Sequence, residues 1–323
     1  MRMDQLMELA NLKQGAGQYS REEIDAVLRR VGLDPLNFYQ ELEMSSRYVN
    51  THRDVSQPSD QVQLHSHAFY EILYIRSGTG LPYLVGTERY LLQRGDVVIV
   101  CPGVGHRPLL TSSLPEPYRR DVLWLSQEFV DGIVKMFPES FPLQAAPALL
   151  RTAGTEWEAV LRERFRAGIR EADRQTRGWE VMVLGNTVQL LMLLSRAIED
   201  NRSEPQHVEQ PELLEEVLAY MERHLAEKLT IPAVAQRFFV SERKISNTFR
   251  EEMGVSFHRC LTQRRLIAAK NLIAEGVGLE QVGEQVGFLD YSSFYRAFRQ
   301  VFGISPRQYR KLQDGGEEEA LQL

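Results

Sequence analysis

The sequence of 323 residues is 43% hydrophobic and 25% charged, an ordinary balance for a globular protein, and its length predicts two domains. It contains no uninterrupted apolar run long enough to span a bilayer, and its first residues, MRMDQLMELANLKQ, are too polar for a signal peptide. We therefore expect a cytoplasmic protein without a membrane partner. Cys101 and Cys260 lie far apart in the sequence, which favours reduced thiols over a disulfide.

The net charge of −6 is unevenly distributed along the chain. Residues 1–210 hold 23 Lys and Arg against 28 Asp and Glu, a net charge of −5. Residues 211–312 hold 15 against 12, a net charge of +3, and residues 313–323 hold four acidic residues and no basic one. A net charge of +3 is small for a nucleic-acid-binding domain, so the positions of the basic residues matter more than their number.

The N-terminal half predicts helices followed by a small β-barrel. Residues 1–45 are predicted to form a helical extension, in which Ser20 caps the amphipathic segment REEIDAVLRRV. Within 46–150, short alternating runs such as FYEILYI, RYLLQ and DVVIVC are separated by glycine-containing turns. Many short strands of this kind are typical of a barrel or sandwich.

Two further helices are predicted within residues 151–200. The second of them, WEVMVLGNTVQLLMLLSRAIE, is apolar nearly all round, so it either packs on its own barrel or contacts a partner chain. Residues 201–211 have the composition of a linker, and the acidic tail 313–323 is expected to be disordered. The segment between them, 212–312, is predicted to be all helical, so the fold class is α+β with several domains.

The segment 212–312 contains the same pattern twice. The copies are TIPAVAQRFFVSERKISNTFREEMGVSFHRCL and GLEQVGEQVGFLDYSSFYRAFRQVFGISPRQYR. Each predicts a short helix, a turn, and a second helix that is capped by Ser241 or Asp290 and ended by Gly254 or Gly303. Two helices joined by a tight turn form a helix-turn-helix unit. A helical bundle with a duplicated packing pattern is the alternative, but it does not explain why caps, stops and basic faces coincide in both copies.

The outward face of each second helix carries side chains suited to DNA. Arginine reads guanine and asparagine reads adenine through paired hydrogen bonds, and basic groups contact phosphates. We expect double-stranded DNA to be contacted by Arg243, Lys244, Ser246, Asn247 and Arg250 in the first copy, and by Tyr291, Ser292, Tyr295, Arg296 and Arg299 in the second. The helix predicted between the copies, about 30 Å long at about 1.5 Å per residue, would let one chain reach successive major grooves, about 34 Å apart.

The stretch VGFLDYSSFYRAFRQVFGISPRQYRK resembles the signature region of the AraC/XylS family of bacterial transcription regulators. This resemblance implies a regulator, more commonly an activator, that acts as a homodimer and contacts RNA polymerase. By position, Arg243, Ser246 and Asn247 match base-reading residues of the first unit; the corresponding residues of the second unit are Ser292, Tyr295 and Arg296. One departure is Phe239, which stands where the family has glycine, whereas Gly287 keeps the glycine of the second turn.

The stretch HSHAFYEILYIRSG carries candidate metal ligands. On a strand, His65, His67 and Glu71 share one face, and His106 could supply a fourth ligand. Two imidazoles and a carboxylate suit iron, nickel, manganese or zinc. The alternative is that these groups hydrogen-bond an organic ligand or one another, so that no cofactor is required.

HSHAFYEILYIRSG also resembles the first motif of the cupin superfamily, and GDVVIVCPGVGH resembles the second with one residue fewer between Pro and His. The resemblance implies a sensor domain for a small-molecule effector, often a sugar. We expect effector contacts from His65, His67, Glu71, Tyr83, His106 and Trp124. No partner for turnover stands beside the metal ligands, which favours a protein that is not an enzyme. A metal-dependent cupin enzyme or a metal sensor joined to a DNA-binding domain is the alternative.

Overall fold

The computed structural model describes residues 44, 46–60, 62–110, 114–138, 146, 148–201 and 212–311. The helices predicted for the N-terminal extension lie outside these residues. The predicted linker, apart from Asn201, and the predicted acidic tail lie outside them as well. The described residues form two compact units. One holds every labelled strand and α3 to α8, and the other holds α9 to α11 together with His224–Thr230.

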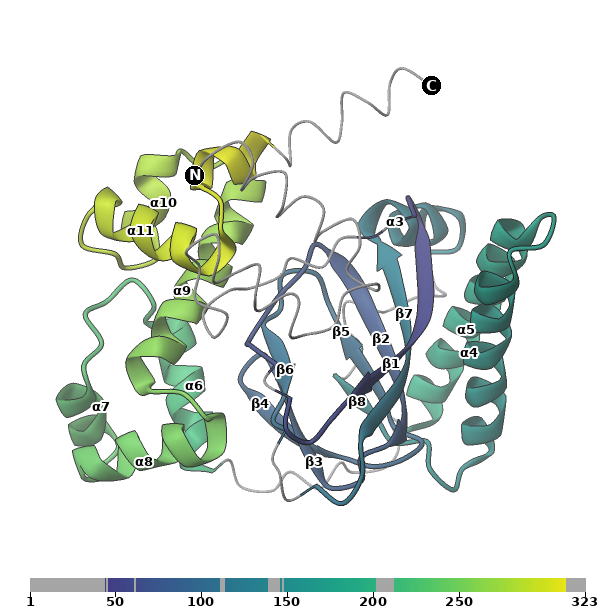
Figure 1. The fold of residues 1–323 in the computed structure, drawn as a ribbon, viewed down its shortest axis with the longest axis horizontal. Helices are drawn as coiled ribbons and strands as arrows, with labels where there is room; N and C mark the ends of the chain where they lie inside the picture. Colours follow the sequence, from purple (N-terminus) through teal and green to yellow (C-terminus); the bar gives the residue numbers. More distant parts are fainter. Residues whose placement is uncertain are drawn as a thin grey trace. The chain divides into compact units, whose positions relative to one another are not determined.

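The strands form two antiparallel sheets that face each other (Figure 1). The five-stranded sheet has the order β1 (Val49–Ser56), β7 (Tyr118–Ser126), β2 (Phe69–Ser77), β5 (Val97–Val100) and β8 (Leu149–Leu150). The three-stranded sheet has the order β4 (Glu88–Leu92), β3 (Leu81–Val85) and β6 (His106–Pro108). The predicted small barrel is therefore confirmed.

Strand β2 is buried on both faces, which explains its nearly continuous apolar sequence. Leu73 and Ile75 pack into the core between the two sheets, together with Leu81 of β3. Ile72 and Tyr74 alternate with them and point to the opposite face, where helices cover the sheet. Glu71 shares the inward face with Leu73, so the polar residues around it belong to the barrel interior.

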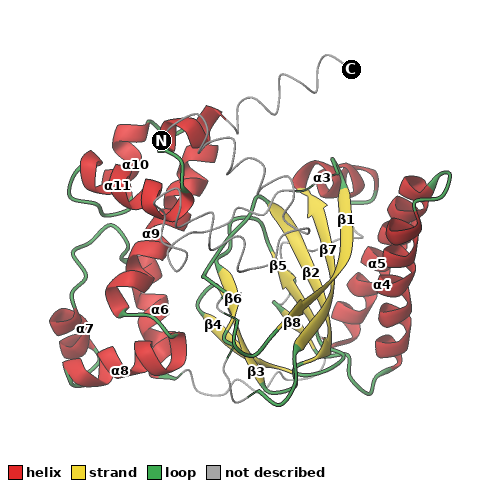
Figure 2. Ribbon diagram, in the orientation of Figure 1, coloured by secondary structure: helices red, strands yellow, loops and turns green. Residues whose placement is uncertain are grey.

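Helices α4 (Glu156–Arg174) and α5 (Trp179–Asn201) lie side by side against the five-stranded sheet (Figure 2). Thr155 caps α4, and its side chain accepts a hydrogen bond from the backbone N–H of Trp157. A shorter helix, α3 (Gln127–Met136), follows β7 directly and is capped by Ser126. The two-helix prediction for 151–200 is confirmed.

Helix α5 bears on the expectation that no apolar segment of the chain is long enough to span a bilayer. Within the described ranges it is the one helix long and apolar enough to cross a membrane by length and composition, and 39% of that window is buried. Leu190, Leu191 and Leu194 lie in the core with the sheet. Val181 and Met182 are 71% and 58% exposed. The core helix of a globular domain can have the same length and apolar composition, so the buried face accounts for much of the apolar composition of α5.

The C-terminal segment is helical throughout its described length. The first helix-turn-helix copy consists of α7 (Ile231–Arg237) and α8 (Glu242–Met253), and α6 (Leu213–Arg223) precedes it. The second helix-turn-helix copy consists of α10 (Leu279–Gln285) and α11 (Tyr291–Phe302), and α9 (Phe257–Ala274) lies between the two copies in the sequence. In the second unit, side chains of α9 and α11 such as Leu266, Phe294 and Phe298 form one buried cluster.

Candidate functional site

Helix α8 is fixed at both ends by the residues that the repeat predicted. The Ser241 side chain accepts a hydrogen bond from the backbone N–H of Lys244, at 3.1 Å. Gly254 ends the helix in the left-handed conformation, with φ of 61°. Ile245 and Phe249 are fully buried. The opposite face is therefore free to meet a ligand as large as a DNA duplex.

Helix α11 repeats this arrangement. The Asp290 carboxylate accepts a hydrogen bond from the backbone N–H of Ser293 at 2.7 Å, and Gly303 ends the helix with φ of 74°. The same hydrogen bond, followed by one from the Ser293 hydroxyl, lowers the pKa of Asp290. Phe294 and Phe298 are fully buried on the inner face. Both second helices are thus short, capped and anchored by an aromatic side chain.

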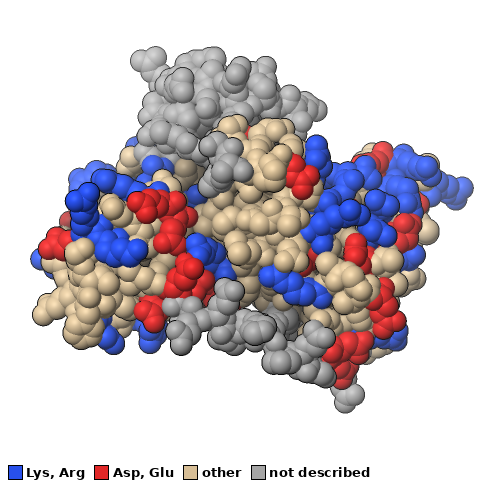
Figure 3. Space-filling view, turned by 90° about the horizontal axis from the view of Figure 1, so that it is seen from below, with Lys and Arg blue, Asp and Glu red and all other residues tan. Residues whose placement is uncertain are grey.

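The predicted DNA-contacting residues lie on the solvent side of these two helices. Exposed residues are Arg243, Lys244, Arg250, Tyr291, Ser292, Arg296 and Arg299, and half-buried residues are Ser246, Asn247 and Tyr295. On the face drawn in Figure 3, Lys and Arg side chains occur in groups that are interrupted by Asp and Glu side chains. Arg243, Lys244 and Arg250 of α8 and Arg296 and Arg299 of α11 are exposed, so these helices carry basic side chains although the net charge of residues 211–312 is small. Contact of these ten residues with DNA stays a prediction.

The turns of the two units differ at one equivalent position. Phe239 and Gly287 both have positive φ, of 55° and 90°. The residue after each donates a hydrogen bond to the first helix: Val240 to the Ala235 carbonyl and Phe288 to the Gly283 carbonyl. The structure thus confirms that Phe239 stands at the glycine position.

Only the second turn is crowded. A Cβ atom at Gly287 would lie 2.2 Å from the carbonyl oxygen of Leu225 and 2.7 Å from an Nη atom of Arg265. The Arg265 guanidinium donates to the carbonyls of Leu225 and Glu227, which holds that chain segment against the turn. Phe239 is 93% exposed instead, so a side chain fits there at the cost of backbone strain alone.

In the barrel, three of the predicted ligands converge. Ligand atoms of His67, Glu71 and His106 lie within 4.8 Å of one another, and all three residues are buried. Nε2 of His106 is 3.0 Å from a carboxylate oxygen of Glu71, and Nε2 of His67 is 3.8 Å from the same oxygen. His65 lies beside them, its ring centroid 4.2 Å from that of His106, without joining the convergent group.

The backbone orients the histidine rings. Nδ1 of His67 lies 2.7 Å from the Phe69 carbonyl oxygen, and Nδ1 of His106 lies 3.0 Å from that of Val104. A carbonyl only accepts, so each Nδ1 carries a proton, and each Nε2 faces the Glu71 carboxylate. Both Nε2 atoms are buried without a hydrogen-bond partner in the described part of the chain. This pairing of Nδ1–H with a backbone carbonyl is the support that metal-binding histidines have.

Burial and neighbouring groups determine the charges of the cluster. Burial lowers the pKa of His67, and burial together with the neighbouring His106 lowers the pKa of His65 well below its usual value. Burial raises the pKa of Glu71, but the adjacent rings of His106 and His67 outweigh burial and hold this pKa well below its usual range. Neutral imidazole beside an ionised carboxylate is the protonation state that a metal ion requires.

The two predicted aromatic contacts also lie in the barrel. The indole N–H of Trp124 donates to the second oxygen of Glu71 at 2.8 Å. Tyr83 is 2% exposed, and its ring centroid is 6.3 Å from that of Tyr118. Tyr83 therefore lines the apolar part of the interior rather than the histidine cluster.

The sequence interpretation missed further polar residues of the interior. Arg120 and Tyr118 lie two and four positions before Val122 on the face of β7 that carries Trp124, and Arg120 donates to Asp54 of β1 at 2.5 Å. The buried hydroxyl of Tyr118 has no hydrogen-bond partner within the described ranges. Counting in steps of two back from Trp124 would have found Arg120 and Tyr118.

Known proteins resemble both parts of this chain. A helix-turn-helix domain model matches residues 234–312, and a cupin domain model matches residues 54–115. The HTH-type transcriptional activator RhaS of Escherichia fergusonii is 25% identical over 260 residues, which cover 77% of this chain and 88% of that relative. The probable transcriptional regulator LumQ of Photobacterium leiognathi is 33% identical over 130 residues, which cover 39% and 50%.

A solved structure of a transcriptional regulator from Chromobacterium violaceum, described as containing an AraC-type DNA-binding domain, is also similar. It is 26% identical, covers 30% of this chain and 88% of its own, and superposes with a TM-score of 0.29. The chain therefore contains both domains that the sequence predicted. The chain thus combines a cupin domain with a helix-turn-helix domain, and over 77% of its length it is similar to the HTH-type transcriptional activator RhaS.

Proposed function

We propose that this protein is a cytoplasmic transcription regulator, acting as an activator, that binds double-stranded DNA and responds to a small molecule held in its cupin barrel. The observation that carries the proposal is the pair of capped helices, α8 and α11, whose solvent faces hold the ten predicted DNA-contacting residues. We assign DNA binding to residues 212–312, effector binding to 46–150 and dimerisation to 151–200. Curated relatives named as transcriptional activators and regulators support this assignment.

The effector we propose is a polyhydroxylated metabolite such as a sugar. The barrel interior combines the Trp124 ring and the Glu71 carboxylate with Tyr118, whose ring lies under the Arg120 guanidinium, 4.6 Å from the ring centroid. Aromatic faces with a few directed polar groups are what a sugar needs, because its C–H faces stack and its hydroxyls hydrogen-bond. The unpartnered Tyr118 hydroxyl is one group that such a ligand would satisfy.

We further propose that His67, Glu71 and His106 hold a divalent metal ion. The fit rests on the two unpartnered Nε2 atoms and on the carboxylate that lies between them. Nitrogen and carboxylate ligands of this kind suit a first-row divalent metal. Such an ion would supply an electrophilic point for an oxygen of the effector. A metal sensor remains the second candidate function, and a metal-dependent cupin enzyme is the third.

We propose a homodimer that forms through α5. Val181 and Met182 are exposed, and Val188 and Met192 lie half-buried about two and three turns further along the helix. An apolar stripe of this kind is typical of an interface between copies. RNA polymerase would be the further partner, as the activator role requires.

The test is DNA selection followed by a salt titration. Wild-type protein would be used to select duplexes from a random pool, and the affinity for the selected duplex would be measured between 50 and 200 mM salt, the range over which about 10³–10⁵ in affinity is lost when many phosphates are contacted. We expect a steep linear fall of log affinity with log salt. The double variant R243A/R296A should flatten the slope, whereas R177A, an exposed arginine outside the helical domain, should not. Binding that is weak and independent of salt would overturn the DNA-binding assignment.

A further inference from the structure

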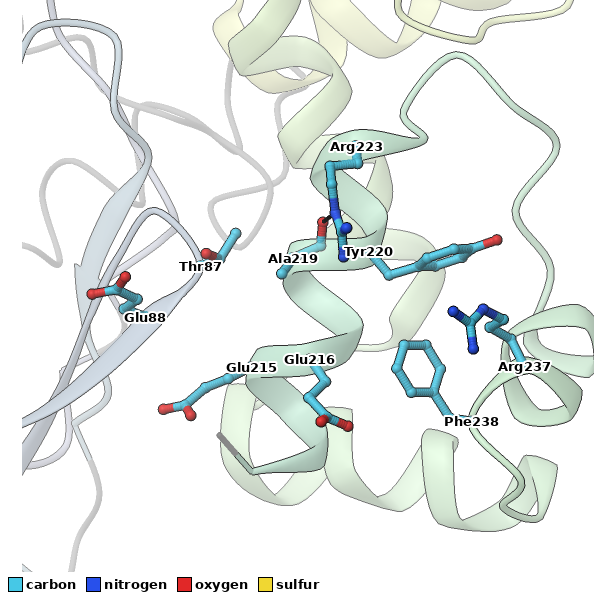
Figure 4. Close-up of a pocket in the computed structure, with 9 residues that line it drawn as sticks. All are labelled: Thr87, Glu88, Glu215, Glu216, Ala219, Tyr220, Arg223, Arg237 and Phe238. Atoms are coloured by element: carbon cyan, nitrogen blue, oxygen red, sulfur yellow. Dashed lines mark hydrogen bonds between the residues drawn. The ribbon is translucent and has the colours of Figure 1, made fainter. Parts of the chain in front are cut away.

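The turn between β3 and β4 borders two cavities of different chemistry. The first, of about 380 Å³, lies between Thr87 and Glu88 of the turn and the helices α6 and α7, and its lining includes Arg223 and Arg237 (Figure 4). The second, of about 440 Å³, is lined mainly by aliphatic side chains: Val85, Ile99, Val104, Ala146, Ala148 and Leu149. None of the six predicted effector contacts is among the described residues that line it. The second cavity is therefore not the predicted effector site.

This second cavity lies where the two sheets of the barrel meet without a common strand. Among the described strands, none belongs to both sheets. Strand β8, at the edge of the larger sheet, is two residues long and pairs with Val97 and Val98 of β5. The cavity lining takes Ile99 from the next position of β5, Leu149 from β8 and Val85 from β3. Both sheets thus contribute walls, and the strand arrangement itself creates the space.

The walls of the second cavity are apolar, and one edge is acidic. Val85, Ile99 and Leu149 are buried. Glu88 is exposed, and its carboxylate accepts a hydrogen bond from the hydroxyl of Tyr90, which lines the second cavity and not the first. Figure 4 shows the Glu88 carboxylate directed away from α6. This arrangement suits a ligand with hydrocarbon against the walls and a positively charged donor beside Glu88.

The cavity also borders the loop that presents His106. Val104 lines the cavity, and its carbonyl oxygen lies 3.0 Å from Nδ1 of His106. The backbone N–H of Gly86 donates to the Gly105 carbonyl at 2.8 Å, and Val85 pairs with His106. One side of this loop therefore faces the histidine cluster, and the other faces the cavity. A ligand in the cavity would contact the loop from the side opposite the predicted metal ligands.

We propose that this cavity is a second ligand-binding site, for a small molecule whose aliphatic chain ends in an ammonium group. Its volume of about 440 Å³ falls within the range of about 300–1,000 Å³ that is typical of small-molecule sites. Burial of hydrocarbon against the walls supplies affinity, and the Glu88 carboxylate repels an acid of the same chain length. The proposal is independent of DNA binding and of the metal ion, so it goes beyond the function proposed above.

Cys101 provides a measurement of occupancy, because its thiol belongs to the cavity lining. Cys101 is half-buried, and burial raises the pKa of its thiol, whereas Cys260 is buried. Iodoacetamide, which is small and uncharged, would be added to the folded full-length protein at about pH 8, where a fraction of an exposed thiol is ionised. Mass spectrometry would follow the alkylation of Cys101, and C101S should lack this reaction.

The test compares hexylamine, hexanol and hexanoate, which differ only in their end group. Hexylamine is an ammonium ion at this pH, since alkylamines resemble the lysine side chain, with a pKa of about 10.4. We expect hexylamine to slow the alkylation of Cys101 saturably, hexanol to bind about tenfold more weakly, which is the scale of one charge-assisted hydrogen bond, and hexanoate to have no effect. Protection by none of the three, or equal protection by all three, would overturn the proposal.

A cavity-filling variant locates the site. A148L places a larger side chain in the cavity and should abolish the protection by hexylamine. A159L makes the same change at an exposed alanine of α4 and should retain it. For each variant, the ratio of alkylation rates with and without hexylamine is compared, after circular dichroism has shown that it is folded. An unchanged ratio in folded A148L would place hexylamine elsewhere and overturn the site.

A charge variant tests the ligand class even if A148L does not fold. E88Q keeps an acceptor for the Tyr90 hydroxyl and removes the negative charge. It should weaken hexylamine about tenfold, to the affinity of hexanol, and leave hexanol unchanged. E199Q, at an exposed glutamate of α5, should leave both affinities as they are. Hexylamine that binds E88Q as tightly as wild type would overturn the assignment of an ammonium group to the ligand.

Discussion

Nε2 of His106 lies 3.0 Å from a carboxylate oxygen of Glu71 while Nδ1 of the same ring is hydrogen-bonded to the Val104 carbonyl. If Nε2 carries no proton, its lone pair faces a negative oxygen. The two repel each other unless a proton or a metal cation lies between them. Nε2 of His67 faces the same oxygen at 3.8 Å. A cation among the three groups resolves both conflicts at once.

Elemental analysis of the purified full-length protein, prepared without chelator, should therefore show about one equivalent of a divalent first-row metal. H67A/H106A should lose it, because both nitrogen ligands are gone. H224A, which removes a half-buried histidine outside the cluster, should retain it. Folded wild-type protein without metal would instead make the three residues hydrogen-bonding groups of the effector site.

Replacing Gly287 by alanine should destabilise the second helix-turn-helix unit by about 2–4 kcal/mol, because the new Cβ would meet the Leu225 carbonyl. Replacing Gly254, where no atom lies within 4 Å, should cost only about 1 kcal/mol for its positive φ. Urea unfolding of both variants measures the difference. Equal losses would show that the turn relaxes away from the carbonyl.

At the exposed Phe239, a substitution by glycine is predicted to raise the stability of the protein. Phe239→Gly removes the strain of a non-glycine residue at φ of 55° and loses little packing, since the side chain is 93% exposed. We expect a gain of about 0.5 kcal/mol, reduced from the strain itself by the greater freedom of glycine in the unfolded chain. Thermal unfolding would detect it. A clear loss of stability would mean that the phenyl ring has a partner in the folded protein.

Arg296→Ala tests base reading by α11. If Arg296 contacts a base, the variant should lose about 1–3 kcal/mol on the selected duplex and relax discrimination at one base pair. Binding to a panel of single-base variants of that duplex measures both effects. A uniform loss on every sequence would make Arg296 a phosphate contact. R307A, at an exposed arginine beyond α11, provides the matched control.

The exposed end of α5 tests the dimer. V181E/M182E places two charges on the apolar stripe, and we expect dimer to become monomer in sedimentation velocity experiments. V160E makes a similar change at an exposed valine of α4 and should leave the dimer intact. A dimer that survives V181E/M182E would place the contact elsewhere.

Features set by local chemistry could be predicted from the sequence. The caps at Ser241 and Asp290 and the stops at Gly254 and Gly303 depend on residues within one helical turn, and all four are confirmed. The resemblance to the AraC/XylS signature also located the anomalous Phe239. For the barrel, strand alternation predicted that His67 and Glu71 share one face; their ligand atoms do converge, although His67 lies before β2 begins at Phe69.

Features set by distant pairing could not be predicted in the same way. Asp54 and Arg120 meet because β1 and β7 pair in a register that no local pattern specifies. The carbonyl of Leu225 approaches Gly287 because Arg265 holds that segment in place, a contact between residues some 40 positions apart or more. The burial of one face of α5 likewise depends on the sheet and the helix beside it.

The hydrogen bond from the Trp124 indole to Glu71 gives the barrel an optical signal of its own. The other two tryptophans, Trp157 and Trp179, belong to α4 and α5, so W157F/W179F would leave a single fluorophore beside the cluster. Any ion or metabolite that draws charge from the Glu71 carboxylate alters the partner of that indole. Titrations of candidate ligands could then be followed by emission alone, with no dye and no DNA, before any operator sequence has been determined.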